Sequence, residues 1–352
     1  MLPFATLTEQ SELYHEVEIA QVIAETADAK TFVLRPVGWE LKYKPGQFLT
    51  FVIPTLQGHV RRSYSFSSVP PEAPAVTVKR MANGVLSRPL LESGAAGDRL
   101  TVAGRSSGFF TLPDNLQDYE QIVFIAGGSG ITPVFSLIKA LAALPRAPSV
   151  LLAYSNKSPN RTIFREPLEA LEKEGKLEIE WYFSERQDLL RARLSKTTIG
   201  TLLERRLKVR ITKTLAYLCG PFDFMRTAAI VLQSMGMPSD NIRREVFTPD
   251  VIKVNDLPPD TDAHHVTLLI GGRRHEFRVQ YPDTILTAAK RRGIELPYSC
   301  ESGRCGSCIA QCVEGKIWIR YNEVLTDKEV EAGRILVCQS FPVAGDAVIE
   351  YN

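Results

Sequence analysis

Short runs of alternating hydrophobic and polar positions fill the first third of the chain. Val17 and Ile19 alternate with polar neighbours, and similar runs recur at residues 31–34, 48–53, 76–78 and 100–102. Turn residues such as Pro45-Gly46 and Gly97-Asp98 separate the runs. Many short strands with regular turn signals predict an antiparallel β-barrel over residues 1–113.

The middle of the chain has a different rhythm. Apolar runs at 121–126, 150–154 and 215–219 and the strand-like stretch 177–183 predict strands, and the stretches 133–144, 167–174 and 223–235 predict helices. Buried strands that alternate with helices indicate a doubly wound, parallel α/β domain. We expect this domain to span residues 114–248.

A polar, proline-rich stretch follows at residues 249–262 and predicts a semi-rigid linker. The last predicted domain, 263–352, opens with a hairpin pattern in which Gly271-Gly272 separates two strand-like runs. A helix is expected near residues 284–291.

Composition narrows the range of partners and compartments. The net charge of +2, from 42 basic and 40 acidic residues, gives no electrostatic case for binding nucleic acid or an anionic membrane. Residues 1–10 have neither a basic stretch nor an apolar core, and no apolar run approaches the ~20 residues that span a bilayer. We therefore expect a cytoplasmic protein. In that reducing compartment, clustered cysteines favour metal binding over disulfides.

Four of the six cysteines have the spacing of a plant-type [2Fe-2S] site: Cys300, Cys305, Cys308 and Cys338. Three thiolates then lie on one loop and the fold brings in the fourth. Gly303 and Gly306 allow backbone N–H groups to approach the bridging sulfides closely. Structural zinc and unrelated core thiols are the alternatives, although only Cys305 and Cys308 have the spacing of a zinc knuckle. Cys312 is expected to be a small core residue.

Residues 263–352 as a whole resemble plant-type ferredoxins. The resemblance implies a β-grasp fold around the cluster, with the four cysteines as its ligands.

A second motif, Arg62-Ser63-Tyr64-Ser65 followed by Ser67 and Ser68, resembles the R-x-Y-S-x-x-S signature of the ferredoxin–NADP reductase family. The resemblance implies that Arg62 neutralises a flavin phosphate, that Tyr64 lies along the flavin, and that Ser65 reaches flavin N5. Downstream, Gly84-Val85-Leu86-Ser87 predicts a helix start, whose free N–H groups suit a pyrophosphate. This favours FAD; FMN, used by a branch with the same domain order, is the alternative.

The nicotinamide site is predicted from two loops that follow strands. Gly128-Ser129-Gly130-Ile131-Thr132-Pro133 leads from a strand into a helix, the context of a phosphate-binding loop. Its G-x-G-x-x-P pattern resembles ferredoxin–NADP reductases, and so does Cys219-Gly220-Pro221 with Met225. In that family the cysteine lies beside the reacting nicotinamide.

Glu245-Val246-Phe247 resembles the E-x-F that ends the reductase family's nucleotide domain. The resemblance implies that Glu245 lies near flavin N5 and that Phe247 covers the flavin face that nicotinamide must displace. A surface glutamate and a core phenylalanine are the alternatives. Ser65, Cys219 and Glu245 are thus the predicted catalytic residues.

The choice of coenzyme depends on the loop at residues 155–165. Lys157, Arg161 and Arg165 lie there, and no acidic residue precedes Glu166. Basic side chains suit the 2′-phosphate of NADPH, whereas an acid suits the free ribose hydroxyls of NADH. The loop favours NADPH.

A ferredoxin–NADP reductase unit fused to a C-terminal plant-type ferredoxin resembles the reductase components of bacterial oxygenases, including those of phenylacetyl-CoA oxygenases. The resemblance implies an electron path from NAD(P)H through FAD and [2Fe-2S] to a redox partner protein, an oxygenase component. Two alternatives stay open: a reductase of another redox protein, such as a hybrid-cluster protein, and a non-catalytic redox sensor.

Overall fold

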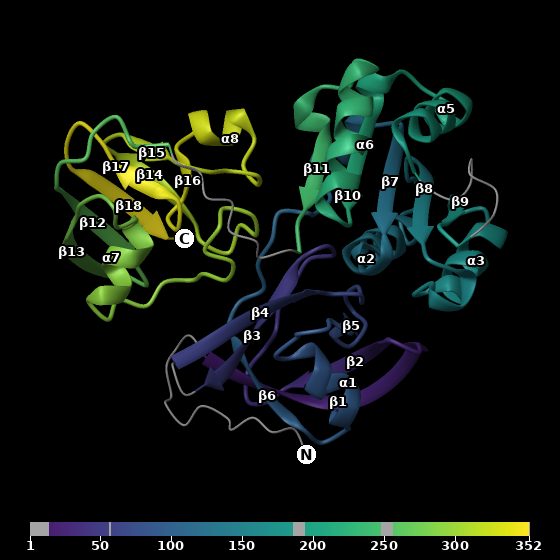
Figure 1. The fold of residues 1–352 in the computed structure, drawn as a ribbon, viewed down its shortest axis with the longest axis horizontal. Coiled ribbons are helices and arrows are strands. Elements are labelled where there is room, and N and C mark those ends of the chain that lie inside the picture. The colour runs from purple at the N-terminus through teal and green to yellow at the C-terminus, as the bar shows by residue number, and fades with distance from the viewer. Residues whose placement is uncertain (1–13, 56–57, 186–193, 248–255, 352) are drawn as a thin grey trace. The chain divides into compact units, whose positions relative to one another are not determined.

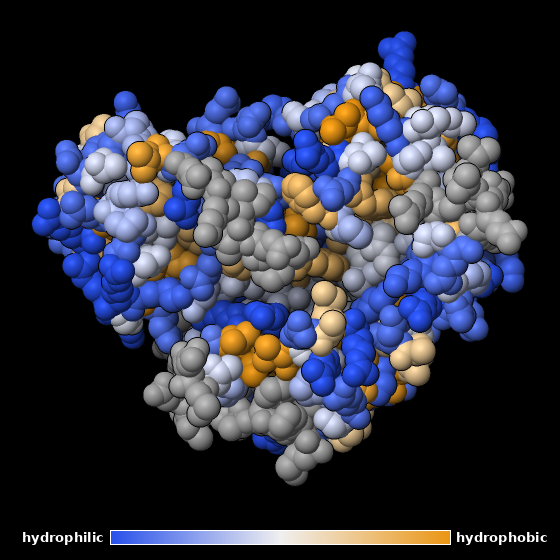
Figure 2. Space-filling view, in the orientation of Figure 1, coloured by the Kyte–Doolittle hydropathy of each residue, from blue (hydrophilic) through white to orange (hydrophobic). Residues whose placement is uncertain are grey.

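The computed structural model describes residues 14–55, 58–185, 194–247 and 256–351 (Figure 1). The chain divides after Phe247 into two compact units, residues 1–247 and 248–352. The first part of the predicted linker, up to residue 255, lies outside the described residues. Hydrophobic side chains form small, separate patches on a mostly hydrophilic face (Figure 2). Among the described residues, no helix is both long and apolar enough to cross a bilayer.

Six antiparallel strands form the barrel predicted for the start of the chain. They are β1 (Tyr14–Thr26), β2 (Ala29–Pro36), β3 (Phe48–Thr55), β4 (Gly58–Ser65), β5 (Ala75–Lys79) and β6 (Arg99–Ala103). Their order is β4-β3-β6-β1-β2-β5, and a bridge between Phe66 and Val76 joins the two ends of the sheet. The short helix α1 (Ser87–Ser93) follows β5.

Alternation explains which barrel strands the sequence predicts. Val17 and Ile19 of β1 are fully buried in the barrel core, and so are Phe32 of β2 and Phe51 of β3. Strand β4 was missed because its residues are mostly polar and show no apolar face. It is held by continuous antiparallel pairing with β3.

Five parallel strands form the second sheet, in the order β11-β10-β7-β8-β9. They are β7 (Gln121–Gly127), β8 (Ser149–Asn156), β9 (Glu178–Phe183), β10 (Thr214–Cys219) and β11 (Ile242–Glu245). The helices are α2 (Ile131–Ala142), α3 (Arg165–Lys173), α5 (Lys196–Arg206) and α6 (Phe222–Ser234). Short 3-10 turns are η1 (Leu116–Asp118), η2 (Gly128–Gly130), η3 (Pro159–Arg161), η4 (Ile211–Lys213) and η5 (Ser239–Asn241).

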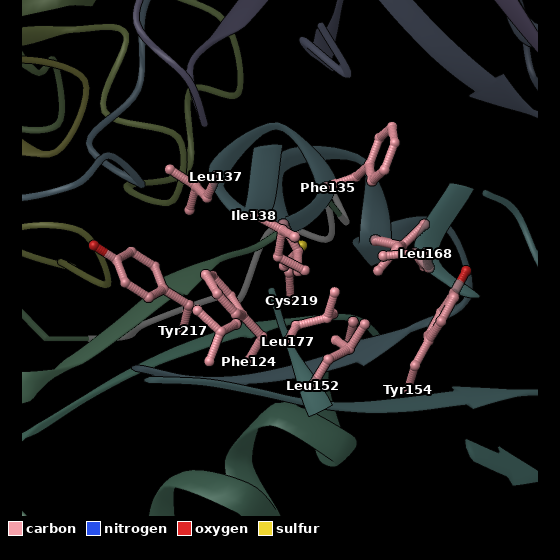
Figure 3. Close-up of a cluster of buried hydrophobic side chains, with 14 of the residues drawn as sticks. Phe124, Phe135, Leu137, Ile138, Leu152, Tyr154, Leu168, Leu177, Tyr217 and Cys219 are labelled. Carbon is pink, nitrogen blue, oxygen red and sulfur yellow. The ribbon is translucent and has the colours of Figure 1, made fainter. Parts of the chain in front are cut away.

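Hydrophobic side chains cover both faces of this sheet. On one face Phe124 and Leu152 pack with Ile138 of α2 and Leu168 of α3 (Figure 3). On the other face the alternate strand residues pack against α5 and α6. The doubly wound α/β prediction is confirmed. Strand order reverses between β7 and β10, and open sheets of this kind bind ligands at that point, beyond the carboxyl ends of the strands.

The barrel and the parallel sheet contact each other within the first unit. The ring of Phe110, just after the barrel, lies edge-on to Tyr217 with centroids 5.0 Å apart. The Tyr217 hydroxyl donates to the carbonyl of Thr111 at 2.7 Å, and the buried Ser136 of α2 donates to the carbonyl of Ser68 at 2.6 Å. These contacts fix the carboxyl ends of the parallel strands against the barrel.

The second unit is a mixed sheet with the order β13-β12-β18-β14-β16, in which β12 and β18 are parallel. Its elements are β12 (His264–Ile270), β13 (Arg273–Val279), α7 (Ile285–Arg291), β14 (Ile309–Glu314), β15 (Ile317–Ile319), α8 (Asp327–Glu331), β16 (Arg334–Leu336), β17 (Ser340–Pro342) and β18 (Ala347–Tyr351). Strands β15 and β17 form a separate ribbon. The predicted hairpin is present, with both turn glycines at positive φ, and Thr284 caps α7.

The last residues of the predicted linker are fixed to this second unit. The Asp260 carboxylate accepts hydrogen bonds from the Ala344 N–H at 2.7 Å and contacts the His264 ring at 2.6 Å. Asp346 accepts in turn from the His265 N–H at 2.8 Å. Because Asp260 is bonded to residues of the ferredoxin-like unit, the chain from Asp260 onward belongs to that unit.

A matched pair of glycines tests the close packing at the strand-order reversal. A Cβ on Gly130 would lie 2.1 Å from the Cys219 carbonyl oxygen, whereas one on Gly200, within α5, would meet nothing within 4 Å. We predict that Gly130→Ala lowers the free energy of unfolding of the first unit by about 2–4 kcal/mol. Gly200→Ala should raise it by about 0.5–1 kcal/mol, because alanine favours helix. Denaturant unfolding measures both; equal effects would contradict the packing.

Candidate active site and iron–sulfur site

Three strand ends bring together the three residues predicted to be catalytic. Ser65 ends β4, Cys219 ends β10 and Glu245 ends β11. The Ser65 hydroxyl donates to Glu245 Oε2 at 2.8 Å, although the two residues are 180 positions apart in the chain. Cys219 and Glu245 are register partners in the parallel ladder. The site therefore forms where the barrel meets the carboxyl edge of the parallel sheet.

Burial keeps this trio uncharged at neutral pH. Ser65, Cys219 and Glu245 are 3%, 0% and 7% exposed. Loss of hydration raises the pKa of Glu245 to about 8, against the opposing effect of the Ser65 hydrogen bond. Burial, reinforced by the nearby Glu245, also raises the pKa of the Cys219 thiol. The Glu245 carboxyl group can thus hold a proton at neutral pH. Its hydrogen bond with Ser65 links it to the barrel strand β4.

Burial bears on the alternatives for Glu245 and Phe247, whose roles at the flavin stay predictions. Glu245 is not a surface glutamate, and Phe247 is not a core phenylalanine, since its side chain is 43% exposed. Met81 and Val85 are also exposed hydrophobic side chains, at 65% and 39%. Exposed apolar groups of this kind beside a flavin motif are what a bound flavin would cover.

The other flavin residues lie on and after β4. Tyr64 packs edge-on to Phe51, with centroids 5.8 Å apart, and burial raises its pKa to about 12. Arg62, two positions earlier, is exposed and available to an anion.

The predicted helix start is present, since α1 begins at Ser87. A Cβ on Gly84 would lie 1.9 Å from Ser87 Oγ, so a glycine here lets the Ser87 hydroxyl lie close to the turn. The Ser87 hydroxyl accepts from the Met81 N–H at 3.2 Å and Leu86 is buried. These two residues can therefore serve a pyrophosphate only through their backbone. Val85, by contrast, presents its side chain to solvent.

The two predicted nucleotide loops pack directly on each other at the strand-order reversal. A Cβ on Gly127 would lie 3.0 Å from Pro221, and one on Gly220 would lie 3.1 Å from the Gly127 nitrogen. Gly128 adopts a φ of 55°. Backbone N–H groups in such a tight, side-chain-free loop can surround a phosphate.

Some predicted nucleotide residues support the loops instead of lining them. Thr132 and Met225 are each 2% exposed, and Pro133 is buried. The Thr132 hydroxyl donates to the Ser129 carbonyl at 3.0 Å, which closes the loop. Met225, in the first turn of α6, packs in the core. That Met225 belongs to the nucleotide site stays a prediction, and its side chain lies in the core.

Two polar side chains at this edge are not among the site residues predicted from the sequence. Lys79, at the end of β5, is the nearest neighbour of the Gly128 Cβ position, 3.9 Å away. Asn156, at the end of β8, is 7% exposed, and its Nδ2 has no hydrogen-bond partner among the described residues. Only the position of Asn156 at the end of an apolar run could have signalled it. Lys79 places a cation beside the Gly128 turn, which suits an anionic nucleotide.

The four predicted cluster cysteines fall into two pairs in the second unit. Cys300 accepts a hydrogen bond from the Cys305 thiol, which lowers the pKa of Cys300 to about 5. The Cys308 thiol hydrogen-bonds to Cys338, which raises the pKa of Cys308. Among the described residues, no three potential ligands converge on a single ion. The cysteines' C-x4-C-x2-C spacing, with a distant fourth cysteine, is that of a plant-type [2Fe-2S] site.

The loop around these cysteines provides N–H groups to sulfur. The N–H of Cys300 points to Cys305 Sγ at 3.5 Å, and that of Ser302 to Cys300 Sγ at 3.4 Å. Gly303 and Gly306 have φ values of 74° and 72°, which permits this tight path. Donors of this kind stabilise the charged sulfurs of an iron–sulfur cluster. Cys312, by contrast, lies on β14 against the core, as expected.

Comparison with known proteins agrees with both halves of this site. A 2Fe-2S iron-sulfur cluster binding domain matches residues 268–343, and an oxidoreductase NAD-binding domain matches residues 124–229. The chain is 35% identical to the ferredoxin reductase component of 3-ketosteroid-9-alpha-monooxygenase from Rhodococcus rhodochrous, over 95% of each chain. The chain belongs to the family of oxygenase ferredoxin reductase components.

Further relatives of this reductase component share its whole length. It is 30% identical to one of the subunits of 1,2-phenylacetyl-CoA epoxidase from Escherichia coli, over 96% of this chain and 98% of that protein. The solved structure of phthalate dioxygenase reductase, described as a modular structure for electron transfer from pyridine nucleotides to [2Fe-2S], matches with a TM-score of 0.59. Its identity is 26%, over 96% of this chain and 98% of the other.

The reductase component thus takes electrons from a pyridine nucleotide through FAD to its own [2Fe-2S] cluster. Its residues fit these groups. The barrel presents an arginine, a tyrosine and exposed apolar side chains to a flavin, the glycine loops admit a phosphate, and the paired thiols suit two irons.

The pKa of Glu245 gives a pH prediction for this reductase component. Below about pH 8 the carboxyl group is protonated, and above it a carboxylate forms at the buried Ser65–Glu245 contact, near which the family resemblance implies flavin N5. Negative charge there opposes the arrival of a negative species. We predict that hydride transfer from NADPH to flavin, followed by stopped flow, slows about tenfold between pH 7 and 9. Glu245→Gln should abolish that dependence.

An exposed carboxylate provides the control. Glu178 pairs with Lys208 on the surface of the first unit. Glu178→Gln should keep the wild-type pH profile. A Glu245→Gln variant that still slows tenfold would assign the titration to another group.

Proposed function

We propose that this reductase component passes its electrons to a separate oxygenase component, and that NADPH is its preferred electron donor. The observation that supports this best is the joint presence, in one chain, of a Ser65–Glu245 hydrogen bond at the carboxyl edge of the parallel sheet and four cysteines with the plant-type [2Fe-2S] spacing. A chain with both halves can accept electrons in pairs and release them singly.

The residues of the first unit bind and orient the reactants. The backbone of the Gly128–Gly130 turn holds the nucleotide phosphates, and Cys219 lies beside the nicotinamide ring. The exposed Phe247 occupies the ring's place until the nucleotide displaces it. Arg62 and the backbone before α1 hold the flavin phosphates. Bound FAD accepts two electrons as hydride and passes them on one at a time.

Ser65 and Glu245 manage the proton that accompanies these electrons. The Ser65 hydroxyl donates to Glu245 and so lies between the buried carboxyl group and the flavin site. Because Glu245 is neutral at pH 7, it can hold a proton without placing a fixed negative charge at the site. Burial of Ser65 and Glu245 excludes water from this path.

Capture of the natural acceptor tests the proposed partner. The reduced holoprotein, immobilised anaerobically, should retain a terminal oxygenase from the native extract. The purified pair should consume O2 with NADPH and oxidise an organic substrate. Recovery of a hybrid-cluster protein instead would establish the alternative reductase. Absence of turnover with ferricyanide or cytochrome c would favour a redox sensor.

The coenzyme proposal can be tested on three basic side chains. Arg165 Nε pairs with Glu169 at 2.8 Å. Lys157 directly follows β8, and Arg161 is the last residue of η3. We predict that Lys157→Ala with Arg161→Ala lowers kcat/KM for NADPH at least tenfold and for NADH less than threefold. Arg165→Ala should change either value by less than threefold. A wild-type preference for NADH would refute the proposal.

The linker proposal concerns residues 249–259. A proline-rich connection of this length would let the cluster unit move between the flavin and the partner. We predict that deleting about half of it leaves flavin reduction by NADPH unchanged but slows bleaching of the cluster. Stopped-flow absorbance separates the two steps. Cluster bleaching at the wild-type rate in the shortened protein would argue against such movement.

A further inference from the structure

The residue directly after the fourth cluster cysteine makes a contact that the electron path does not explain. Gln339 is 5% exposed, and its Nε2 donates to the carbonyl of Glu301 at 2.9 Å. Glu301 directly follows Cys300, the first cysteine of the cluster loop. A single side chain thus joins the segment that carries the fourth thiol to the loop that carries the other three.

The loop is held in an unfavourable conformation at the point of this contact. Glu301 has a φ of 53°, in the left-handed region that residues with a side chain rarely adopt. A backbone of this kind persists only where its surroundings hold it, at a cost of the order of 1 kcal/mol or more. The hydrogen bond from Gln339 to the Glu301 carbonyl is a direct restraint on this peptide.

A second residue fixes which way the Gln339 amide faces. Arg320 Nε donates to Gln339 Oε1 at 3.1 Å, and the Arg320 N–H donates to the Gln339 carbonyl at 2.9 Å. The Arg320 guanidinium also lies over the Phe341 ring, 5.5 Å from its centroid. With its oxygen occupied by a cation, the amide must present its NH2 group to Glu301.

The same region encloses the next turn of the loop. A Cβ on Gly303 would lie 2.5 Å from the Tyr321 carbonyl oxygen and 3.1 Å from Gln339 Cγ. The Glu323 N–H donates to the Gly303 carbonyl at 3.1 Å. The loop is therefore packed against Gln339 as well as hydrogen-bonded to it.

We infer that Gln339 is a positioning residue for the cluster: with Arg320, it latches the three-cysteine loop to the segment of the fourth cysteine. The latch keeps the four thiols in place when an iron–sulfur bond opens, and so it slows cluster loss. It also limits the change in loop geometry when the cluster gains or loses an electron. The inference rests on the assigned [2Fe-2S] cluster and adds to it residues that bind no iron.

A neighbouring glutamine provides a matched control. Gln311 of β14 also donates from Nε2 to a backbone carbonyl, that of Ala332 at 2.7 Å, in the same unit. Its bond joins β14 to the end of α8 and makes no link to Glu301. Gln339→Met and Gln311→Met each remove two side-chain hydrogen bonds at nearly constant volume, and only Gln339→Met breaks the link to Glu301.

The test uses the full-length holoprotein under anaerobic conditions with excess EDTA. The visible absorbance of the cluster reports its loss, and the flavin absorbance reports the integrity of the first unit. We expect Gln339→Met to lose the cluster about five- to tenfold faster than wild type, the factor for one hydrogen bond of about 1 kcal/mol. Gln311→Met should stay within twofold. The electron paramagnetic resonance spectrum of the reduced cluster should broaden in Gln339→Met alone.

Two Arg320 variants extend the test if the Gln339→Met protein cannot be loaded with a [2Fe-2S] cluster. Arg320→Met leaves the glutamine but frees its amide, and should accelerate cluster loss; Arg320→Lys keeps a donor and should restore much of the wild-type lifetime. Equal rates of loss in Gln339→Met and Gln311→Met, with identical spectra, would overturn the latch. Wild-type protein that binds no cluster after iron and sulfide loading would instead refute the cluster assignment itself.

Discussion

The hydrogen bond from Ser65 to Glu245 joins the end of a barrel strand to the end of a parallel strand, and the reaction site depends on this junction. Both groups are buried, so their contact requires the barrel and the parallel sheet to stay packed together. The packing of Phe110 and Thr111 against Tyr217 maintains that arrangement. A flavin held by the barrel and a nucleotide held by the sheet then share one edge, where a neutral carboxyl group can hold a proton.

The elements predicted correctly from the sequence are those whose burial leaves a mark on their own residues. Strand β7 is apolar throughout because both of its faces are covered, and β1 alternates because one face is exposed. Strands β4 and β11 carry Ser65 and Glu245, yet neither was predicted as a strand. Their residues are largely polar, and pairing with a neighbouring strand, which no local pattern reveals, defines them.

The same distinction applies to the site. The cysteine spacing is local, so the cluster ligands and their loop could be predicted directly. The pairing of Glu245 with Ser65 could be expected only from the family resemblance, because 180 residues separate them. Gln339 gives no local signal, and Asn156 is marked only by its position at the end of an apolar run. Their roles follow from the edge of the sheet and from the return of the chain to the cluster loop, which only the fold shows.

The central claim is that one chain accepts electron pairs and releases single electrons. Anaerobic titration of the purified protein with NADPH, followed by visible absorbance, tests it most directly. We predict that flavin and cluster bands bleach together and that each chain takes up about three electrons, two on FAD and one on the cluster. Bleaching of the flavin alone, with about two electrons per chain, would show that Cys300 to Cys338 do not hold a working cluster and would contradict the account.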